Sequence, residues 1–170
     1  MNPFLRVIDA LNAAGASYVI VGGFAAYLHG SRRATVDLDI VVDLQETEAR
    51  KAVRALLSLG FQSRLPVDPL SFADAAERQR WVSEKNMLVF TMFDPANPGF
   101  VVDLFVESPA EFGEFSGRAR QVQIDGHNVR ICSIEDLIAM KEKSGRSQDI
   151  TDIAALRRIQ SVEGGVDELA

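Results

Sequence analysis

The sequence predicts an α+β fold: one mixed β-sheet flanked by helices, with further helices at the C-terminus. Short apolar, β-branched runs of strand length alternate with segments in which apolar residues recur at helical spacing. The chain has 170 residues, of which 47% are hydrophobic and 25% charged. This length and composition suit a single globular core better than two independent domains.

The N-terminal part predicts the order helix, strand, helix, strand, helix. Asn2 followed by Pro3 marks the start of the first helix, and its apolar spacing continues to Gly15. Gly60 marks the end of the fifth element. The expected elements between these marks are a strand over 18–21, a short helix over 24–28, a strand over 36–42 and a helix over 43–59.

The C-terminal part predicts two hairpins and two helices. Its elements are a weak strand over 61–64, a helix around 73–83, a hairpin of 87–93 with 100–106 across the connector 94–99, a smaller hairpin of 121–124 with 128–131, a helix from the cap Ser133 to about 143, and a helix over 148–159. We therefore expect a core over 1–132, a helical extension packed on it over 133–160, and a mobile acidic tail over 161–170.

Charge and composition exclude several classes of protein. A formal charge of -6 and a pI near 4.9 argue against extended binding of nucleic acid, although an RNA end can enter a local basic pocket. The apolar runs are too short to cross a bilayer, and no export signal is visible. The single cysteine, Cys132, excludes an internal disulfide and a cysteine-rich zinc site, which fits a cytoplasmic location.

Two acids interrupt the predicted strand over 36–42. Residues two apart in a strand project from the same face, so Asp37 and Asp39 point their carboxylates in one direction while Leu38 and Ile40 point in the other. Two like charges side by side need compensation by a cation or by hydrogen-bond donors. Mg²⁺ provides this directly, because it prefers hard oxygen ligands and leaves positions free for phosphates and water.

Asp103 repeats the anomaly within the strand predicted over 100–106. If this strand lies beside the one bearing Asp37 and Asp39, the three acids could hold two metal ions roughly 3.5 to 4 Å apart, as in-line phosphoryl displacement requires. Either acidic feature alone is more often a solvated strand end or a satisfied strand acid. Their combination favours a metal site.

Gly22 and Gly23 lie where an apolar strand passes directly into a helix. Free backbone N–H groups at the helix start, with no side chain in the way, form an anion site that suits a phosphate. A glycine pair by itself is more often only a tight turn.

In this order, the motifs resemble those of the nucleotidyltransferase superfamily (the polymerase-β-like fold). Gly22 and Gly23 match its phosphate-facing turn, Asp37 and Asp39 its first metal-binding pair, and Asp103 its third carboxylate. The resemblance implies transfer of a nucleoside monophosphate from an NTP to a hydroxyl group, with two Mg²⁺ ions, or Mn²⁺ in their place, and release of pyrophosphate.

The C-terminal residues are similar to those of small bacterial stand-alone members and abortive-infection toxins. In that setting Lys141 could reach the triphosphate, although a solvated helix lysine is equally expected. Arg33 or Arg32 could hold phosphate, with an exposed loop role as the alternative. We interpret Asp149 as an N-cap and Asp152 as a first-turn acid. We assign no chemistry to His29, Trp81 or Cys132, which we expect to be packing residues.

The acceptor is open at this stage: a small hydroxylated compound, a tRNA end and a partner protein's side chain all fit. An alternative function is a catalytically silent nucleotide-binding protein or toxin–antitoxin partner, in which case an antitoxin would be a binding partner. A glycosyltransferase ranks lowest, because it would need a longer nucleotide-binding half before Asp37, and only 36 residues precede this acid.

Overall fold

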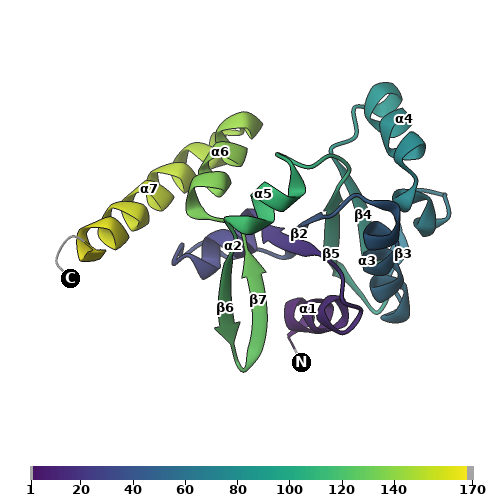
Figure 1. The fold of residues 1–170 in the computed structure, drawn as a ribbon, viewed down its shortest axis with the longest axis horizontal. Helices are drawn as coiled ribbons and strands as arrows, with labels where there is room; N and C mark the ends of the chain where they lie inside the picture. The colour runs from purple at the N-terminus through teal and green to yellow at the C-terminus, as the bar shows by residue number, and fades with distance from the viewer. Residues whose placement is uncertain (1, 168–170) are drawn as a thin grey trace.

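The structure is a computed structural model that describes residues 2–167 (Figure 1). Within these residues the strands form one seven-stranded sheet in the order β3-β4-β5-β2-β1-β7-β6. The strands are β1 (Tyr18–Val21), β2 (Asp37–Val42), β3 (Gln62–Ser63), β4 (Val89–Asp94), β5 (Asn97–Phe105), β6 (Arg120–Ile124) and β7 (His127–Ile131). The helices are α1 (Pro3–Ala13), α2 (Gly22–Leu28), α3 (Glu46–Ser58), η1 (Pro69–Ala73), α4 (Ala75–Lys85), α5 (Phe112–Gly117), α6 (Ile134–Ser144) and α7 (Ser147–Asp167).

The sheet is mixed, as predicted. β2 lies at its centre, antiparallel to β1 and parallel to β5. The two predicted hairpins, β4–β5 and β6–β7, are both present and antiparallel. Because β1 also pairs with β7 in parallel, the hairpin after β5 extends the far side of the sheet and leads into α6. The α+β prediction is therefore confirmed.

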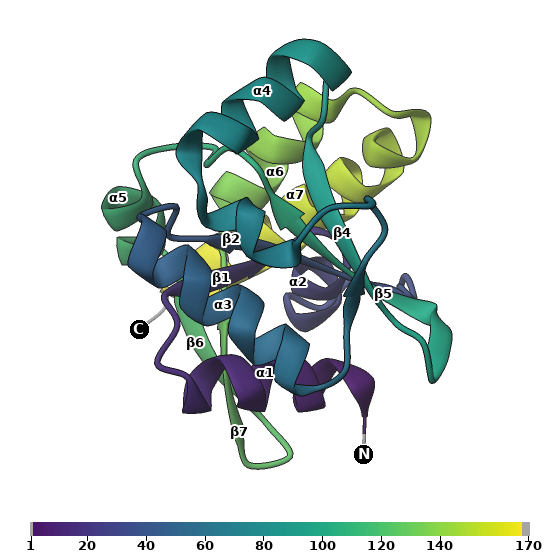
Figure 2. The ribbon, with the colours of Figure 1, turned by 90° about the vertical axis from the view of Figure 1, so that its right-hand side faces the viewer.

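Helices cover both faces of the sheet, with α1 and α3 on one and α2, α6 and α7 on the other (Figure 2). Alternate side chains of β4 and β5 are buried on the first of these faces. There Phe90 stacks on Trp81 with ring centroids 5.2 Å apart, and Phe100 meets Phe4 edge-on at 5.1 Å. Trp81 is thus a packing residue, as expected, and it lies in the core. The intervening side chains of β4 and β5 stay partly exposed on the other face.

The predicted caps are present. The Asn2 side chain accepts a hydrogen bond from the Phe4 amide at 2.9 Å, and Ser133 Oγ accepts one from the Asp136 amide at 3.1 Å. Gly145 ends α6 in the left-handed conformation, with φ of 65°. α5 and η1 were not predicted, because each is shorter than the two turns over which helical spacing can be recognised.

Several boundaries differ from the predictions. The connector between β4 and β5 is only Pro95 and Ala96, because the Asp94 carboxylate accepts a hydrogen bond from the Ala96 amide at 2.9 Å and closes a tight turn. α3 begins at Glu46, three residues later than expected.

The final helix is longer than the predicted span over 148–159. α7 continues to Asp167, and Arg120 in β6 pairs with Glu163 at 3.1 Å. The segment expected as a mobile tail is therefore helical over residues 161–167, while 168–170 lie outside the described residues. Across residues 2–167, no helix combines the length and apolar character needed to cross a bilayer.

Candidate metal and nucleotide site

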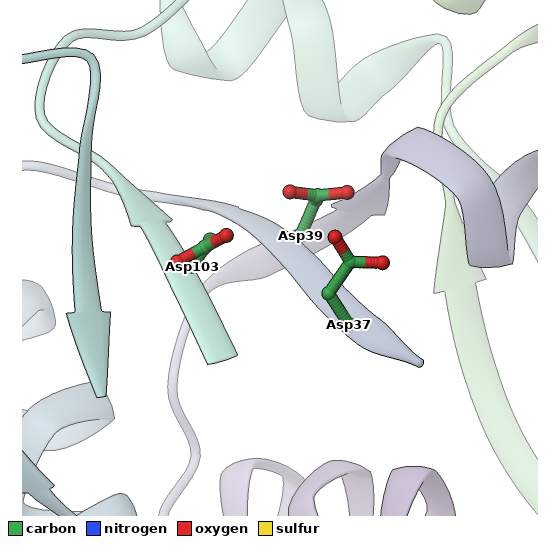
Figure 3. A group of neighbouring side chains, drawn as sticks. All are labelled: Asp37, Asp39 and Asp103. Carbon is green, nitrogen blue, oxygen red and sulfur yellow. The ribbon is translucent and has the colours of Figure 1, made fainter. Parts of the chain in front are cut away.

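The three acids predicted from the sequence lie together on one face of the sheet (Figure 3). Parallel pairing of β2 with β5 places Asp39 directly opposite Asp103, and Asp37 lies two residues before Asp39 on the same face. One carboxylate oxygen from each residue lies within 4.8 Å of the other two. All three side chains are partly exposed, so a ligand can reach them from solvent.

The electrostatics of this cluster are unfavourable when the cluster is fully ionised. Burial, together with the negative charges of Asp37 and Asp103, raises the pKa of Asp39 from 3.8 to about 7, against the opposing effect of Arg146 and Lys141. Burial also raises the pKa of Asp103, although its hydrogen bond from Thr91 and the charge of Arg64 oppose this. A bound divalent cation would offset this repulsion, and three carboxylates are ligands that Mg²⁺ accepts.

The glycine pair lies in direct contact with this acidic cluster. α2 begins at Gly22 itself, two residues before the predicted start, and Gly22 has φ of +67°. A Cβ at Gly22 would lie 2.0 Å from Asp39 Oδ2, and a Cβ at Gly23 would lie 2.9 Å from Thr35 Oγ1. Both glycines are therefore required for close packing, which the sequence did not reveal: Gly22 allows the helix start to approach the Asp39 carboxylate, and Gly23 allows it to approach Thr35.

Two threonine hydroxyls hold the outer acids in place. Thr35 Oγ1 donates a hydrogen bond to Asp37 Oδ1, and Thr91 Oγ1 donates one to Asp103 Oδ1 at 2.5 Å. Each bond leaves the other carboxylate oxygen available to a ligand. Sequence reasoning missed both residues, because threonine is ordinary in strands and loops.

Substituting Thr91→Val should weaken Mg²⁺ binding about tenfold, since one charge-assisted hydrogen bond that orients Asp103 is lost. Valine has nearly the same shape, so the fold should persist. Isothermal titration calorimetry with Mg²⁺ measures the effect, and Thr91→Ser, which keeps the hydroxyl, serves as the control. Equal affinity in wild type and Thr91→Val would mean that this bond does not orient the ligand.

The predicted nucleotide-binding residues Lys141 and Arg33 meet at a buried acid. Lys141 Nζ lies 2.9 Å from Asp152 Oδ2 and 3.6 Å from Asp149 Oδ1, and it is only 8% exposed. Arg33 Nη1 lies 2.7 Å from the same Asp152 oxygen. Asp152 thus joins α6 to the loop that precedes β2. Lys141 is not a solvated helix lysine.

The interpretation of the two C-terminal acids was wrong in detail. α7 begins at Ser147, so Asp149 lies inside its first turn, and Asp152 lies in the second turn. Asp149 nevertheless accepts a hydrogen bond from the Arg146 amide at 3.1 Å, as a capping residue does. Both acids are buried beneath charged partners. The signs that were missed are two acids three residues apart, one helical turn, following a lysine on the preceding helix.

The chain matches the sequence profile of a family described as "Nucleotidyltransferase of unknown function (DUF6036)" over residues 4–166. The chain belongs to this nucleotidyltransferase family. A search of curated proteins found no match to this nucleotidyltransferase.

Solved structures with a similar fold are nucleotidyltransferases as well. ANT(2'')-Ia in complex with adenylyl-2''-tobramycin has 14% identity and a TM-score of 0.58, with 98% of this chain and 97% of that chain covered. The lincosamide antibiotic adenylyltransferase LnuA with bound lincomycin has 16% identity and a TM-score of 0.61, with coverage of 92% and 95%. A putative nucleotidyltransferase from Thermotoga maritima has 14% identity and a TM-score of 0.57, with 97% of this chain and 91% of that chain covered. At these identities the similarity shows a shared fold.

In this nucleotidyltransferase, His29 and Cys132 are buried, as expected of packing residues. His29 Nε2 lies 2.8 Å from the Cys132 carbonyl oxygen, which ties the end of α2 to the residue that follows β7. Burial raises the pKa of the Cys132 thiol to about 12, so the thiol stays protonated and unreactive near neutral pH. Arg32 is exposed at the surface.

Proposed function

We propose that this protein transfers a nucleoside monophosphate from an NTP to a hydroxyl acceptor, with divalent metal held by Asp37, Asp39 and Asp103. The observation that carries the proposal is the convergence of the three carboxylates within 4.8 Å on one sheet face. The start of α2 at Gly22 lies against the same carboxylates, which brings an anion-binding helix start and a cation site together. A triphosphate with its metal ions needs both.

The donor set fits two Mg²⁺ ions, with Mn²⁺ as an alternative. Asp37 and Asp39 would hold both ions, and Asp103 would complete the one on the acceptor side. When bound, such ions supply Lewis-acid stabilisation of the phosphate charge and lower the pKa of the attacking hydroxyl. The raised pKa of Asp39 supports the assignment, because a carboxyl group in this state gains most from a neighbouring cation.

The remaining groups of the chain would bind and orient the nucleotide. The backbone N–H groups at Gly22 and Gly23 face the phosphates in this proposal. Lys141 adds a fixed positive charge on the Asp39 side, because Asp152 and Asp149 hold its ammonium group in place. The Arg33 side chain is half-exposed and can add a second cation to the phosphates. Asp103 would orient the acceptor hydroxyl.

A small molecule is the acceptor class that the comparisons favour. The structures of ANT(2'')-Ia and LnuA contain adenylyl-tobramycin and lincomycin, respectively. A tRNA end and a protein side chain rank below this class. A toxin–antitoxin setting, with an antitoxin as partner, and a cytoplasmic location rest on the sequence alone and stay predictions.

Incubation with each NTP, labelled either at the α- or at the γ-phosphate, tests the proposal. The wild-type protein, Mg²⁺ and a cell extract should transfer α-label but not γ-label into an acceptor, since pyrophosphate leaves with the γ-phosphate. Excess EDTA should stop the transfer. Label that appears equally with EDTA would rule out metal-dependent transfer. NTP binding by calorimetry without any transfer would favour the catalytically silent alternative.

A further inference from the structure

A row of side chains crosses the sheet at the level of the metal site. Asp39 lies opposite Asp103, and Asp103 lies opposite Thr91 on β4. The row continues to Arg64, whose amide donates to the Thr91 carbonyl at 3.0 Å and so extends the β3–β4 ladder by one residue. Directly opposed residues project from the same face of a sheet. Arg64 therefore lies on the face of the three acids, beyond Asp103.

The neighbouring rows on this face are mostly apolar. One level along the strands, Asp37 lies opposite Val101, Val101 opposite Phe93, and Phe93 opposite Gln62. In the row on the other side of the Asp103–Thr91 pair, Phe105 lies opposite Val89. Phe93, Val101, Phe105 and Val89 are all partly exposed, whereas their chain neighbours on β4 and β5 are buried on the opposite face. This apolar surface begins directly beside the acids.

Arg64 is a cation without a carboxylate partner in the part of the chain that the structure describes. Its side chain is exposed and forms no ion pair with the side chains of residues 2–164. The cations on the Asp39 side differ: Lys141 and Arg33 pair with Asp152, and Arg146 pairs with Asp149. Among the described cations whose charge acts on Asp39 or Asp103, Arg64 is thus the one without an ion-pair partner.

We propose that Arg64 and the apolar side chains of β4 and β5 bind the acceptor, and that this acceptor is a small hydroxyl compound with an apolar part and one phosphate or carboxylate group. This inference rests on the proposed function, since it assigns the substrate of the same site. Phe93 and Val101 contact the apolar part, and Arg64 binds the anionic group. A single free cation matches a single anionic group, whereas a cationic acceptor meets a like charge at Arg64.

The net charge of the protein disfavours a longer anionic acceptor. With -6 overall and three carboxylates in the site, a polynucleotide would meet repulsion that one arginine does not offset. The reaction needs no co-reactant other than the NTP. The acceptor oxygen forms a bond to the α-phosphorus, and the bond from that phosphorus to pyrophosphate breaks. The hydroxyl proton leaves to solvent.

Charge-sorted acceptor pools test the inference. Small molecules from an extract are separated into anionic, neutral and cationic pools and incubated with protein, Mg²⁺ and α-labelled NTP. Label should enter the anionic pool. For its main labelled compound, Arg64→Gln should raise KM about tenfold with little change in kcat, as loss of one charge-assisted contact in binding predicts. Arg54→Gln, an exposed arginine on α3, should leave KM unchanged. Label in the cationic or neutral pool, or an unchanged KM in Arg64→Gln, would overturn the inference.

A binding measurement separates this inference from the proposed function. Phenyl phosphate, benzyl alcohol and benzylamine are titrated into the protein with Mg²⁺ and a non-hydrolysable ATP analogue, and NMR shifts report binding. Phenyl phosphate should bind most tightly, and Arg64→Gln should weaken it about tenfold while Arg54→Gln does not. If no pool accepts label, the proposed function fails, yet this titration still decides the role of Arg64. Equal binding of phenyl phosphate to wild type and Arg64→Gln would remove that role.

Discussion

Asp39→Asn is expected to lower nucleotide transfer about a thousandfold or more and, without metal, to raise the melting temperature of the protein. The activity falls because an amide cannot neutralise a cation, and loss of a preorganised charge at a reacting centre has effects of this order. The stability rises because Asp39 is partly buried beside two other acids, which makes its negative charge unfavourable in the folded state. One substitution thus separates the contribution of this carboxylate to activity from its unfavourable effect on the stability of the fold.

The stability effect has a defined pH dependence. The folded-state pKa of Asp39 is about 7, above the ordinary value of 3.8, so ionisation opposes folding. The cost is absent below about pH 4, grows as the pH rises toward 7 and is complete above it. In EDTA, the melting temperature of Asp39→Asn should therefore exceed that of wild type by roughly 5 °C or more at pH 8 and match it near pH 3.5. Thermal unfolding followed by circular dichroism measures both.

A matched control removes the same charge elsewhere. Asp125 lies exposed in the turn between β6 and β7 with φ of 49°, a conformation that asparagine also tolerates. Asp125→Asn should change neither transfer nor the pH dependence of unfolding. Mg²⁺ should raise the melting temperature of wild type and of Asp125→Asn, but much less that of Asp39→Asn. Full transfer activity in Asp39→Asn would remove the metal mechanism.

Gly22→Ala should reduce transfer at least about a hundredfold, a loss of roughly 2.7 kcal/mol in transition-state stabilisation. The added Cβ would lie 2.0 Å from Asp39 Oδ2, so either the carboxylate or the start of α2 must shift. Either shift separates Asp39, the proposed cation ligand, from the backbone that we propose faces the phosphates. Steady-state transfer assays and Mg²⁺ titration measure the loss.

Gly15→Ala provides the control for the backbone conformation. Gly15 has φ of +62°, close to the +67° of Gly22, but a Cβ there meets nothing within 4 Å. Both substitutions should therefore share a cost of about 1–2 kcal/mol for placing alanine in the left-handed region. Only Gly22→Ala should lose activity. If both variants kept wild-type transfer, the close approach to Asp39 would be unimportant for catalysis.

Most strands could be predicted because their residues follow the local sequence preferences of β-strands. The three acids could be predicted because they depart from those preferences. Asp37, Asp39 and Asp103 stand out against apolar, β-branched neighbours, and the period of two places the first pair on one face without any tertiary information. The pairing of β2 with β5 could not be derived in this way, since a parallel neighbour is chosen by the packing of the whole sheet. The superfamily resemblance supplied that expectation instead.

The supporting residues were missed for a different reason. Thr91 and Arg64 are unremarkable in a strand and a loop, and they acquire significance only through their register with Asp103. Asp152 follows the pattern of a surface acid near a helix start, yet the approach of α6 and Arg33 buries it. Local sequence rules describe one element at a time, so they cannot indicate that three elements meet at one side chain.

The order of strands in the sheet also has a consequence for synthesis of the protein on the ribosome. β2 leaves the ribosome early, but its neighbour β5 is separated from it by α3, β3, η1, α4 and β4. A nascent chain that ends before β5 therefore exposes Asp37 and Asp39 without their third partner. The pairing of β2 with β5 closes a large loop, so its entropic cost must be met before the two strands join. A half-made chain therefore cannot assemble the complete set of carboxylates on which the proposed metal-dependent transfer relies.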